Sequence, residues 1–274
     1  MTATLRRAGL YLMLIAVGVI MVGPLYWLFT SSLKPSGDIY SFPPSWWPTS
    51  MEWRNYVEAW RSAPFADFYI NSLVTTIVGT LLEVANALLT AYAFVFLRFP
   101  FKRFLFAVLL AALMVPGHVV LLPNYLTVSE LGWINTYQGI IVPGAASAFG
   151  AFLLRQHMLT LPEEIIDAAR VDGAGHLRRL FSVVLPLSRP MVITVTIVSL
   201  VGKWNDFVWP LIVTNTNSMR TLPVGLLMLK NSEGYVNWGA VMAATVFVVL
   251  PVLIVFFIAQ RYIVAGLTQG AVKG

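Results

Sequence analysis

The chain has 274 residues, of which 58% are hydrophobic and only 11% are charged, and its mean hydropathy is +0.77. Soluble globular domains have about 25% charged residues, so this composition excludes an ordinary soluble domain and indicates a membrane protein. Cysteine is absent, which excludes a disulfide framework, a thiolate metal site and a cysteine nucleophile, and the net charge of +6 raises the question of a nucleic-acid partner.

Six apolar segments are each long enough to cross about 30 Å of hydrocarbon, which takes roughly 20 helical residues. The first follows two arginines, but its apolar run exceeds the core of a signal peptide and no cleavage site follows, so we expect an uncleaved span. The third contains Pro116 and Gly117, where we expect a kink. The approximate limits of the six spans are 8–30, 70–96, 104–126, 138–158, 190–213 and 240–262.

Lysine and arginine are distributed unequally between the two sides of these spans. Twelve lie in the flanks that share a side with the N-terminus, five lie on the opposite side, and Lys203 lies inside the fifth span. Cytoplasmic flanks carry the excess of positive charge. We therefore expect both termini in the cytoplasm. The positive charge then orients the protein in its membrane, and no nucleic acid is needed to explain it.

The first external loop, 31–69, is rich in proline and aromatic residues. Trp46, Trp47, Trp53 and Tyr56 fit an aromatic belt at the membrane interface. The same residues also fit a docking or gating surface for a partner outside the cell, and the sequence leaves both interpretations open.

The longest polar interruption, 160–190, falls on the cytoplasmic side. Its first residues, TLPE at 160–163, have the spacing of a capping box, with the proline in the first helical turn. We therefore expect a short helix there, ended by Gly173 and Gly175. A segment this short cannot bury a core of its own. We expect it to project and dock on a cytoplasmic protein, the alternative being a plain loop.

The same segment contains a recognisable motif. The stretch DAARVDGAGHLRRLFSVVLP resembles the EAA loop of permease subunits in binding-protein-dependent ABC importers, with the pattern E-A-A-x-x-D-G-A and, further on, I-x-L-P. Asp167 replaces the usual glutamate and Val183 the usual isoleucine, which keeps the charge or the shape. The resemblance implies that the residues that couple to an ATPase are Glu163, Glu164, Asp167, Ala168, Ala169, Asp172, Gly173, Ala174, Leu185 and Pro186.

The likeness extends over nearly the whole chain. SLKP at 32–35, WNDFVWPL at 204–211 and the tail GLTQGAVKG at 266–274 look like the maltose-type permeases of the carbohydrate-uptake branch. The resemblance implies an all-α membrane protein with six transmembrane helices and a single permease domain over 1–274. Spans two to six would form a five-helix core, about 66–264, with the first span outside it and a short cytoplasmic coupling helix within the coupling loop 160–190.

The resemblance also implies partners and a location. These are a second homologous permease, two cytoplasmic ATPase subunits, an extracytoplasmic substrate-binding protein and membrane lipid, in a bacterial or archaeal plasma (inner) membrane. The chain has no G-x-x-x-x-G-K-[ST] phosphate loop, so we expect ATP and Mg²⁺ on the ATPase partners and no cofactor on this chain. The three histidines have no ligand spacing, which predicts no metal site, and no catalytic constellation predicts an enzyme.

Three ionisable residues, Glu83, Lys203 and Asp206, lie inside predicted spans. A charge there costs at least about 2.5–3.5 kcal/mol, so such residues face protein or water. Lys203 and Asp206 are three residues apart, and an internal ion pair, which Glu83 could join, is one interpretation. The other is that Lys203 lines a substrate pathway and meets an anionic group such as a phosphodiester. A neutral sugar would instead be bound by Trp204, Asn205 and Asp206.

The sequence thus predicts the permease subunit of an ATP-driven importer, not an enzyme. Its solute would be a sugar or a glycerol-phosphate-like compound, such as glycerol-3-phosphate or a glycerophosphodiester, and the sequence does not distinguish these. The alternative is a secondary transporter or channel in which Glu83, Lys203 and Asp206 form an ion-coupling site.

Overall fold

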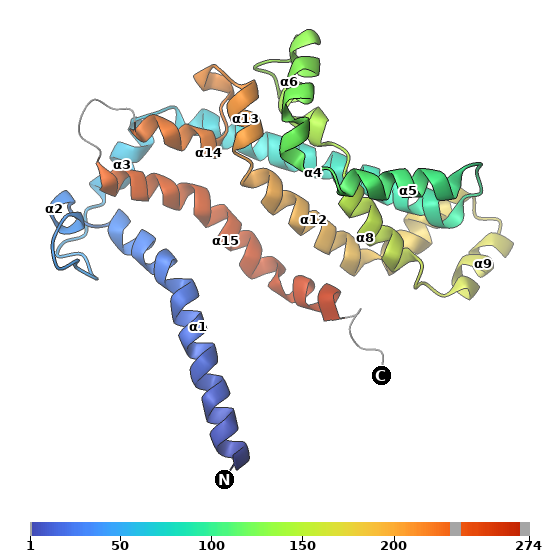
Figure 1. Ribbon diagram of the computed structural model, residues 1–274, viewed down its shortest axis with the longest axis horizontal. Coiled ribbons are helices and arrows are strands. Elements are labelled where there is room, and N and C mark those ends of the chain that lie inside the picture. The colour runs from blue at the N-terminus through green and yellow to red at the C-terminus, as the bar shows by residue number, and fades with distance from the viewer. Residues whose placement is uncertain (1, 231–236, 269–274) are drawn as a thin grey trace. The chain divides into compact units, whose positions relative to one another are not determined.

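A computed structural model gives the structure of the chain, and it describes residues 2–230 and 237–268 (Figure 1). All regular secondary structure in these residues is helical. The helices are α1 Thr2–Ser32, α2 Ser36–Ile39, α3 Arg54–Arg61, α4 Phe65–Phe96, α5 Lys102–Leu113, η1 Gly117–Val120, α6 Leu121–Glu130, α7 Tyr137–Ile141, η2 Val142–Gly144, α8 Ala148–Met158, α9 Glu163–Val171, α10 His176–Arg179, η3 Leu180–Val184, α11 Leu185–Leu187, α12 Arg189–Trp204, α13 Val208–Val213, η4 Asn217–Met219, α14 Leu222–Gly225, η5 Leu226–Lys230 and α15 Trp238–Thr268.

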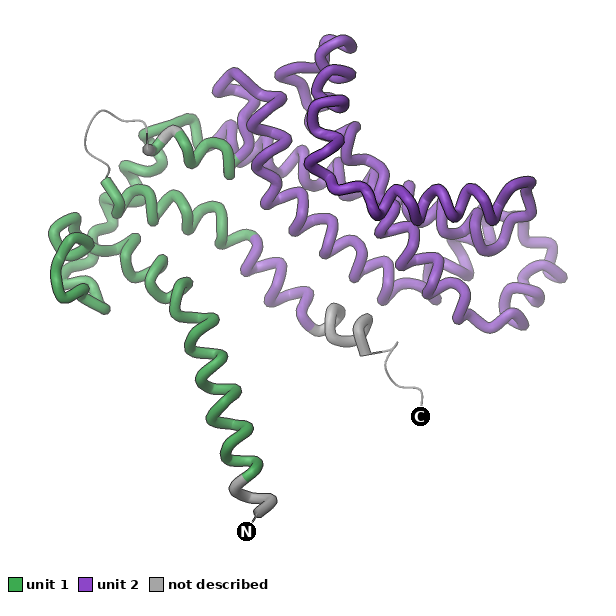
Figure 2. Tube along the Cα trace, viewed as in Figure 1, with its two compact units in different colours: residues 1–65, 222–251 green, residues 66–221, 252–274 purple. Residues whose placement is uncertain are grey.

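By its internal contacts the chain divides into two compact units (Figure 2). Unit 1 consists of residues 1–65 and 222–251, and unit 2 consists of residues 66–221 and 252–274. All the predicted coupling and substrate-pathway residues belong to unit 2. The single permease domain over 1–274 stays a prediction.

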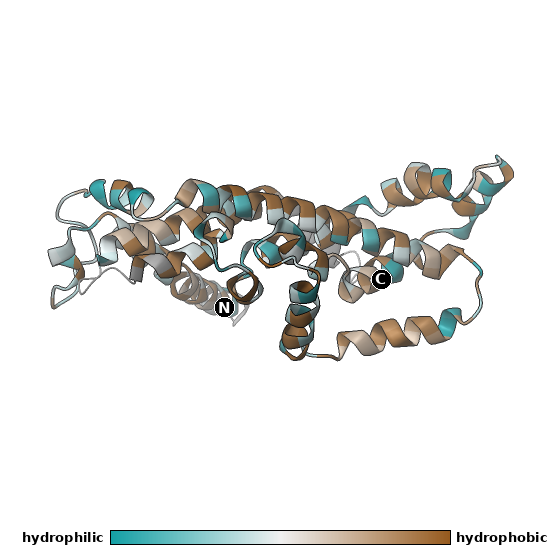
Figure 3. Cartoon of the chain, turned by 90° about the horizontal axis from the view of Figure 1, so that it is seen from above, coloured by the Kyte–Doolittle hydropathy of each residue, from teal (hydrophilic) through white to brown (hydrophobic). Residues whose placement is uncertain are grey.

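Long apolar helices account for the membrane spans. The described residues include three helices long and apolar enough to cross a membrane, Arg6–Ser32, Phe65–Phe96 and Trp238–Gln260. Three bent helix pairs raise the number of spans to six if each pair is one span. Hydrophobic residues dominate the long helices in Figure 3. The predicted all-α membrane fold is confirmed, and the helices are consistent with six spans.

The third predicted span, 104–126, is sharply bent. The axis of α5 meets that of the η1–α6 pair at 95°. Pro116 precedes η1; it has no N–H to donate, and its ring disfavours a helical conformation at the residue before it. The kink predicted at Pro116 and Gly117 is therefore present, and it is close to a right angle.

The fifth predicted span, 190–213, is not one continuous helix. Helix α12 ends at Trp204 and α13 begins at Val208. A continuous helix would need an N–H from Pro210 to the carbonyl of Asp206, and proline has none. The backbone tightens instead, with a bond from the Asp206 N–H to the Lys203 carbonyl. The predicted span is thus made of two helices with a break between them, and Asp206 lies in the break.

One hydrophobic core holds unit 2 together at the C-terminal end of α4. Its buried members include Leu88 and Tyr92 of α4, Leu154 of α8, Ile166 of α9 and Val195 of α12. Helix α8 approaches both α4 and α12 closely through a glycine. A Cβ at Gly150 would lie 3.2 Å from atoms of Ala87 and Val195.

Unit 1 has an aromatic cluster of its own. The ring of Phe247 lies 5.6–6.0 Å from the rings of Tyr56, Trp60 and Phe65. Such ring pairs stabilise a contact by about 0.5–1.5 kcal/mol beyond area burial. The cluster joins α3 and the start of α4 to α15.

Candidate functional site: a charged cavity and a coupling helix

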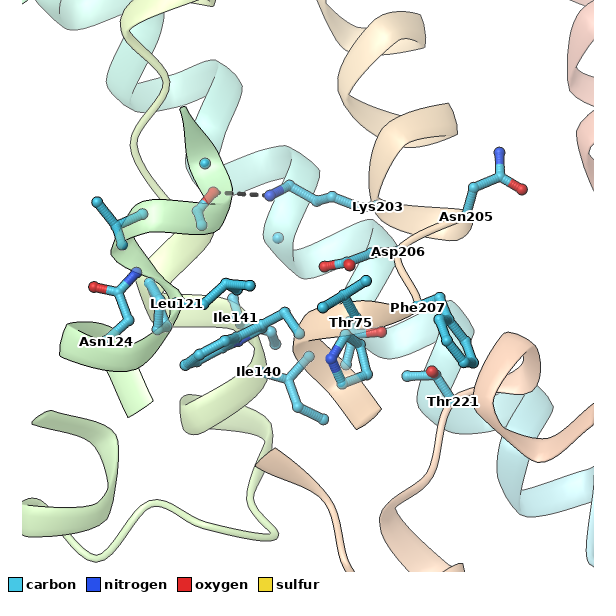
Figure 4. A pocket seen from close by; sticks show the side chains of 18 of the residues that line it. Thr75, Leu121, Asn124, Ile140, Ile141, Lys203, Asn205, Asp206, Phe207 and Thr221 are labelled. Atoms are coloured by element: carbon cyan, nitrogen blue, oxygen red, sulfur yellow. Dashed lines mark hydrogen bonds between the residues drawn. The ribbon is translucent and has the colours of Figure 1, made fainter. Parts of the chain in front are cut away.

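A cavity of about 570 Å³ lies in unit 2. Its wall comes from five parts of the chain: α4, the η1–α6 pair, the α7–η2 pair, the stretch from the end of α12 through the break to α13, and Thr221 (Figure 4). Its size is that of a small-molecule site. Among its described lining residues the ionisable ones are His118, Lys203 and Asp206.

Lys203 is bound on two sides. Its ammonium lies 3.0 Å from the carboxylate of Glu83 and donates a 2.8 Å hydrogen bond to the carbonyl of Gly144 (Figure 4). The side chains of Lys203 and Glu83 are 20% and 15% exposed. The hydroxyl of Ser199 also donates to Glu83, at 2.6 Å. The structure therefore joins Lys203 to Glu83, and the partner within ion-pair distance is not Asp206.

Asp206 faces the cavity. In Figure 4 its carboxylate points towards the middle of the cavity, whereas the amide of Asn205 points away. The backbone N–H groups of Trp209 and Phe207 hydrogen bond to the Asp206 carboxylate. The amide of Asn205 donates to the carbonyl of Val201.

Trp204 is turned into the protein. It is 4% exposed, and its ring centroid lies 6.3 Å from that of Tyr69. Of the five residues predicted for the substrate pathway, Lys203, Asn205 and Asp206 line the cavity, Glu83 reaches it through Lys203, and Trp204 is not among the lining residues. Their role in substrate passage stays a prediction.

The sequence did not reveal the glycines that accommodate Lys203. A Cβ at Gly79 would lie 2.9 Å from the Cδ of Lys203, and one at Gly144 would lie 3.2 Å from its Nζ. These two positions form a slot for the lysine side chain. Glycine inside an apolar span signals close approach, but it does not say of what.

Helix α9 carries the first half of the predicted coupling motif. Ile166 is 5% exposed and belongs to the core of unit 2, whereas Ile165 is 42% exposed and Val171 is 88% exposed. Asp167 and Arg170 form a 2.8 Å ion pair on the exposed side of the helix. Exposed pairs of this kind stabilise a helix by about 0.3–0.5 kcal/mol, so Ile166 is the main anchor.

The start of α9 differs from the predicted capping box. The helix begins at Glu163, and Pro162 is its N-cap, with no side-chain capping bond. The hydroxyl of Thr160 donates to the carbonyl of His157 at 2.7 Å, so it caps the preceding turn. The prediction of a Thr160–Glu163 capping box is therefore wrong. The helix end is as predicted, because Gly173 has φ +75° directly after Asp172.

The second half of the motif forms a π-helical turn, η3, followed by α11. Leu180 and Val184 are fully buried there, and Leu185 and Pro186 follow them. The residues of α9 and α11 that are predicted to couple to the ATPase thus rest on the same core, through Ile166, Leu180 and Val184.

A second cavity, of about 400 Å³, lies beside α9. It is lined by the C-terminal end of α4 and the connection to α5, including Arg98 and Lys102, and by Asp167 and Arg170. The ammonium of Lys102 donates to the carbonyls of Val95 and Leu97, which ties α5 to the end of α4. The coupling helix and the larger cavity therefore lie at different levels of α4, about 25 Å apart from Gly79 to Phe96 at 1.5 Å per residue.

Comparisons with known proteins identify the family. The model of the binding-protein-dependent transport system inner membrane component matches residues 65–269. The sn-glycerol-3-phosphate transport system permease protein UgpE of Yersinia pestis is 32% identical and covers 96% of this chain and 98% of its own length. The corresponding protein of Agrobacterium fabrum is 33% identical and covers 97% of each chain.

A solved structure has the same fold. The crystal structure of a bacterial ABC transporter involved in the import of the acidic polysaccharide alginate contains a chain that matches with a TM-score of 0.85. It is 20% identical and covers 95% of this chain and 97% of that one. The resemblance inferred from the EAA motif is confirmed: the chain belongs to the family of binding-protein-dependent transport system inner membrane components, and it is a multi-pass permease subunit of an ABC importer of the carbohydrate-uptake type.

Proposed function

We propose that this permease moves a sugar or a glycerol-phosphate-like solute into the cell and that a separate ATPase supplies the energy through α9. The solute class is supported by relatives that are named as glycerol-3-phosphate permeases. The observation that carries the coupling is the construction of α9. It is a short helix whose exposed side bears Ile165 and Val171 and whose buried Ile166 enters the core of unit 2.

The fold suggests how a push on α9 would reach the cavity. Ile166 packs with residues of α4, α8 and α12, which continue towards the larger cavity. Packed cores have discrete arrangements and do not deform continuously, so displacement of α9 would move these helices together. The break at Asn205–Phe207 and the bend at η2 are the places where the cavity wall would yield.

The proposal assigns the remaining roles to partners. A second homologous permease would complete the pathway, two cytoplasmic ATPase subunits would dock on the EAA segments, and a substrate-binding protein would deliver the solute. A related alginate transporter has been crystallised with an alginate pentasaccharide-bound periplasmic protein. ATP and Mg²⁺ would be bound by the ATPase subunits and no cofactor by this chain, so the chain itself would not catalyse hydrolysis.

The proposal places both termini and α9 in the cytoplasm. The excess of lysine and arginine in the flanks on that side supports this orientation. The chain has no cysteine, so a thiol introduced by Val171→Cys would be unique in it. A membrane-impermeant maleimide should label this thiol in inside-out vesicles and not in right-side-out vesicles. Labelling from the outside would reverse the assignment.

Reconstitution tests the proposed function as a whole. The chain in liposomes should show no uptake, driven by an ion gradient or by ATP, until the second permease, the ATPase and the binding protein are added. Uptake of radiolabelled solute and ATP hydrolysis should then appear together. Gradient-driven uptake by this chain alone would instead support a secondary transporter that uses Glu83, Lys203 and Asp206.

A further inference from the structure

The charged residues around the larger cavity do not contribute equally to the electrostatic potential inside it. Lys203 is compensated at 3.0 Å by Glu83, and its remaining contact is the carbonyl of Gly144. Because neither side chain is more than 20% exposed, the two charges screen each other at close range with little competition from water. Seen from the cavity, the pair is close to neutral.

The position of this pair is fixed by the backbone on both sides. The stem of Lys203 lies where a side chain at Gly79 would collide, and its ammonium lies where a side chain at Gly144 would crowd it. Glu83 is held further by the 2.6 Å hydrogen bond from Ser199. Lys203, on α12, therefore connects that helix to α4 through Glu83 and to η2 through Gly144.

Asp206 is the charged residue of the cavity lining that no oppositely charged side chain pairs with at ion-pair distance among the described residues. It follows the last turn of α12, its carboxylate points into the cavity, and its protein partners are the backbone N–H groups of Trp209 and Phe207. Ionised carboxylates are acceptors with about four lone-pair sites, so Asp206 retains acceptor capacity for a ligand. The carboxylates of Asp206 and Glu83 and the ammonium of Lys203 together sum to one negative charge.

We infer that Asp206 sets the charge selectivity of this half of the pathway: it accepts hydrogen bonds from the hydroxyls of an uncharged, polyhydroxylated solute and disfavours an anionic one. The Lys203–Glu83 pair joins α12 to α4 and η2 and adds almost no net charge to the cavity. This inference rests on the proposed transport function and narrows it. A phosphorylated solute would meet a like charge here, and the cation that could offset it is already bound.

The electric field in the cavity can be measured without knowing the solute. Asn124 lines the cavity, and Asn124→Cys places a single thiol there because the chain has no other. In the assembled importer, with partner cysteines replaced, this thiol is treated with a cationic trimethylammonium methanethiosulfonate or an anionic sulfonate methanethiosulfonate. The ratio of the two modification rates, relative to the ratio for a small free thiol, reports the sign of the local potential.

The inference predicts a ratio that favours the cationic reagent. Asp206→Asn should lower the ratio by at least about fivefold, the size expected for one unit charge roughly 9 Å from the thiol even at the dielectric constant of water. Asp206→Glu, which keeps the charge, should leave the ratio unchanged. Glu83→Gln should lower the ratio as well, because it uncovers Lys203.

The decisive variant removes both members of the pair. Glu83→Gln combined with Lys203→Met should leave the ratio within about twofold of the starting value, because a neutral pair has been removed. A ratio that rises strongly in this double variant, or that does not respond to Asp206→Asn, would overturn the inference. The modification rates can be measured without ATP and without solute. A failure of ATP-driven uptake would therefore contradict the proposed function without affecting this test of Asp206.

Discussion

The backbone N–H of Ala174 donates a 3.0 Å hydrogen bond to the carbonyl of Ala169 at the end of α9. The N–H of Gly173 donates to the carbonyl of Arg170 at 3.1 Å, and Gly173 has φ +75°. Together these bonds form a Schellman motif, which reverses the chain and satisfies two carbonyls of the last turn. The glycine of the EAA motif is thus explained by backbone geometry, and the direction in which the chain leaves the coupling helix depends on it.

Replacement of Gly173 should loosen this helix end. A residue with a Cβ costs about 1–2 kcal/mol in the left-handed conformation, so Gly173→Ala should favour an alternative turn and misplace Asp172 and Ala174. We expect reduced co-purification of the ATPase, or ATP hydrolysis that no longer accompanies uptake.

The matched control is Gly175→Ala. Gly175 has φ −66°, and a Cβ there would have no neighbour within 4 Å. This variant should assemble and transport like the unmodified protein. Equal behaviour of the two variants would show that the left-handed turn has no part in coupling.

Two adjacent isoleucines of α9 are expected to have different roles: Ile166 anchors the helix in the core, and Ile165 contacts the ATPase. Ile166 is buried in the core, so Ile166→Ala should cost about 2–5 kcal/mol of unfolding free energy. Ile165 is 42% exposed, so Ile165→Ala should change the stability of the isolated permease by less than about 0.5 kcal/mol and weaken ATPase docking instead. Thermal unfolding of the purified chain and ATPase co-purification measure the two effects. A reversed order would mean that α9 buries its other side.

Because Gly79 lines the slot that holds the Lys203 side chain, replacing it by alanine should have an unusual effect on stability. In a helix interior, glycine to alanine is ordinarily stabilising by about 0.8–1 kcal/mol. Here the added Cβ would lie 2.9 Å from the Lys203 stem, which can move only by lengthening its bonds to Glu83 and Gly144. Overpacking of this kind costs about 1–3 kcal/mol, so Gly79→Ala should be destabilising on balance.

The control for this prediction is Gly202, which lies on α12, the helix that carries Lys203. A Cβ at Gly202 of α12 would have no neighbour within 4 Å. Gly202→Ala should therefore keep the helix-propensity gain, and its melting temperature should not fall. If Gly79→Ala melts at or above the temperature of Gly202→Ala, Lys203 is not confined by the slot.

The sequence was sufficient for the fold class and the family, and the structure is consistent with the six predicted spans. These follow from runs of apolar residues and from a local motif, which are properties of neighbouring residues in the chain. The coupling role of 160–190 stays a prediction. The sequence offered both Asp206 and Glu83 as partners of Lys203 and could not choose between them, because Glu83 is 120 positions away and its meeting with Lys203 depends on how α4 packs against α12. The capping box failed for a related reason: the hydroxyl of Thr160 donates to the carbonyl of His157 in the turn before it, and the T-x-x-E spacing does not show to which side the hydroxyl will bond.

The loop 31–69, which is predicted to be external, supplies a prediction about pH. The carboxylate of Asp38 accepts hydrogen bonds from the backbone N–H and the hydroxyl of Thr49, at 2.9 and 2.8 Å. These bonds hold the pKa of Asp38 below its ordinary value. A carboxyl group whose pKa is lower in the folded state stabilises the fold above its unfolded pKa of about 3.9 and loses that contribution as the pH falls through the folded value.

Hydrogen exchange of residues 36–50 should therefore be constant from neutral pH down to about pH 4, once corrected for the intrinsic rate, and accelerate below it. Thr49→Val removes the hydroxyl donor and keeps the backbone N–H, so the folded pKa of Asp38 should rise towards the unfolded value. The acceleration should then be smaller and should level off at a higher pH. Asp38→Asn should abolish the pH dependence, because no proton is then taken up at this position. An unchanged acid transition in Asp38→Asn would show that Asp38 is not its cause.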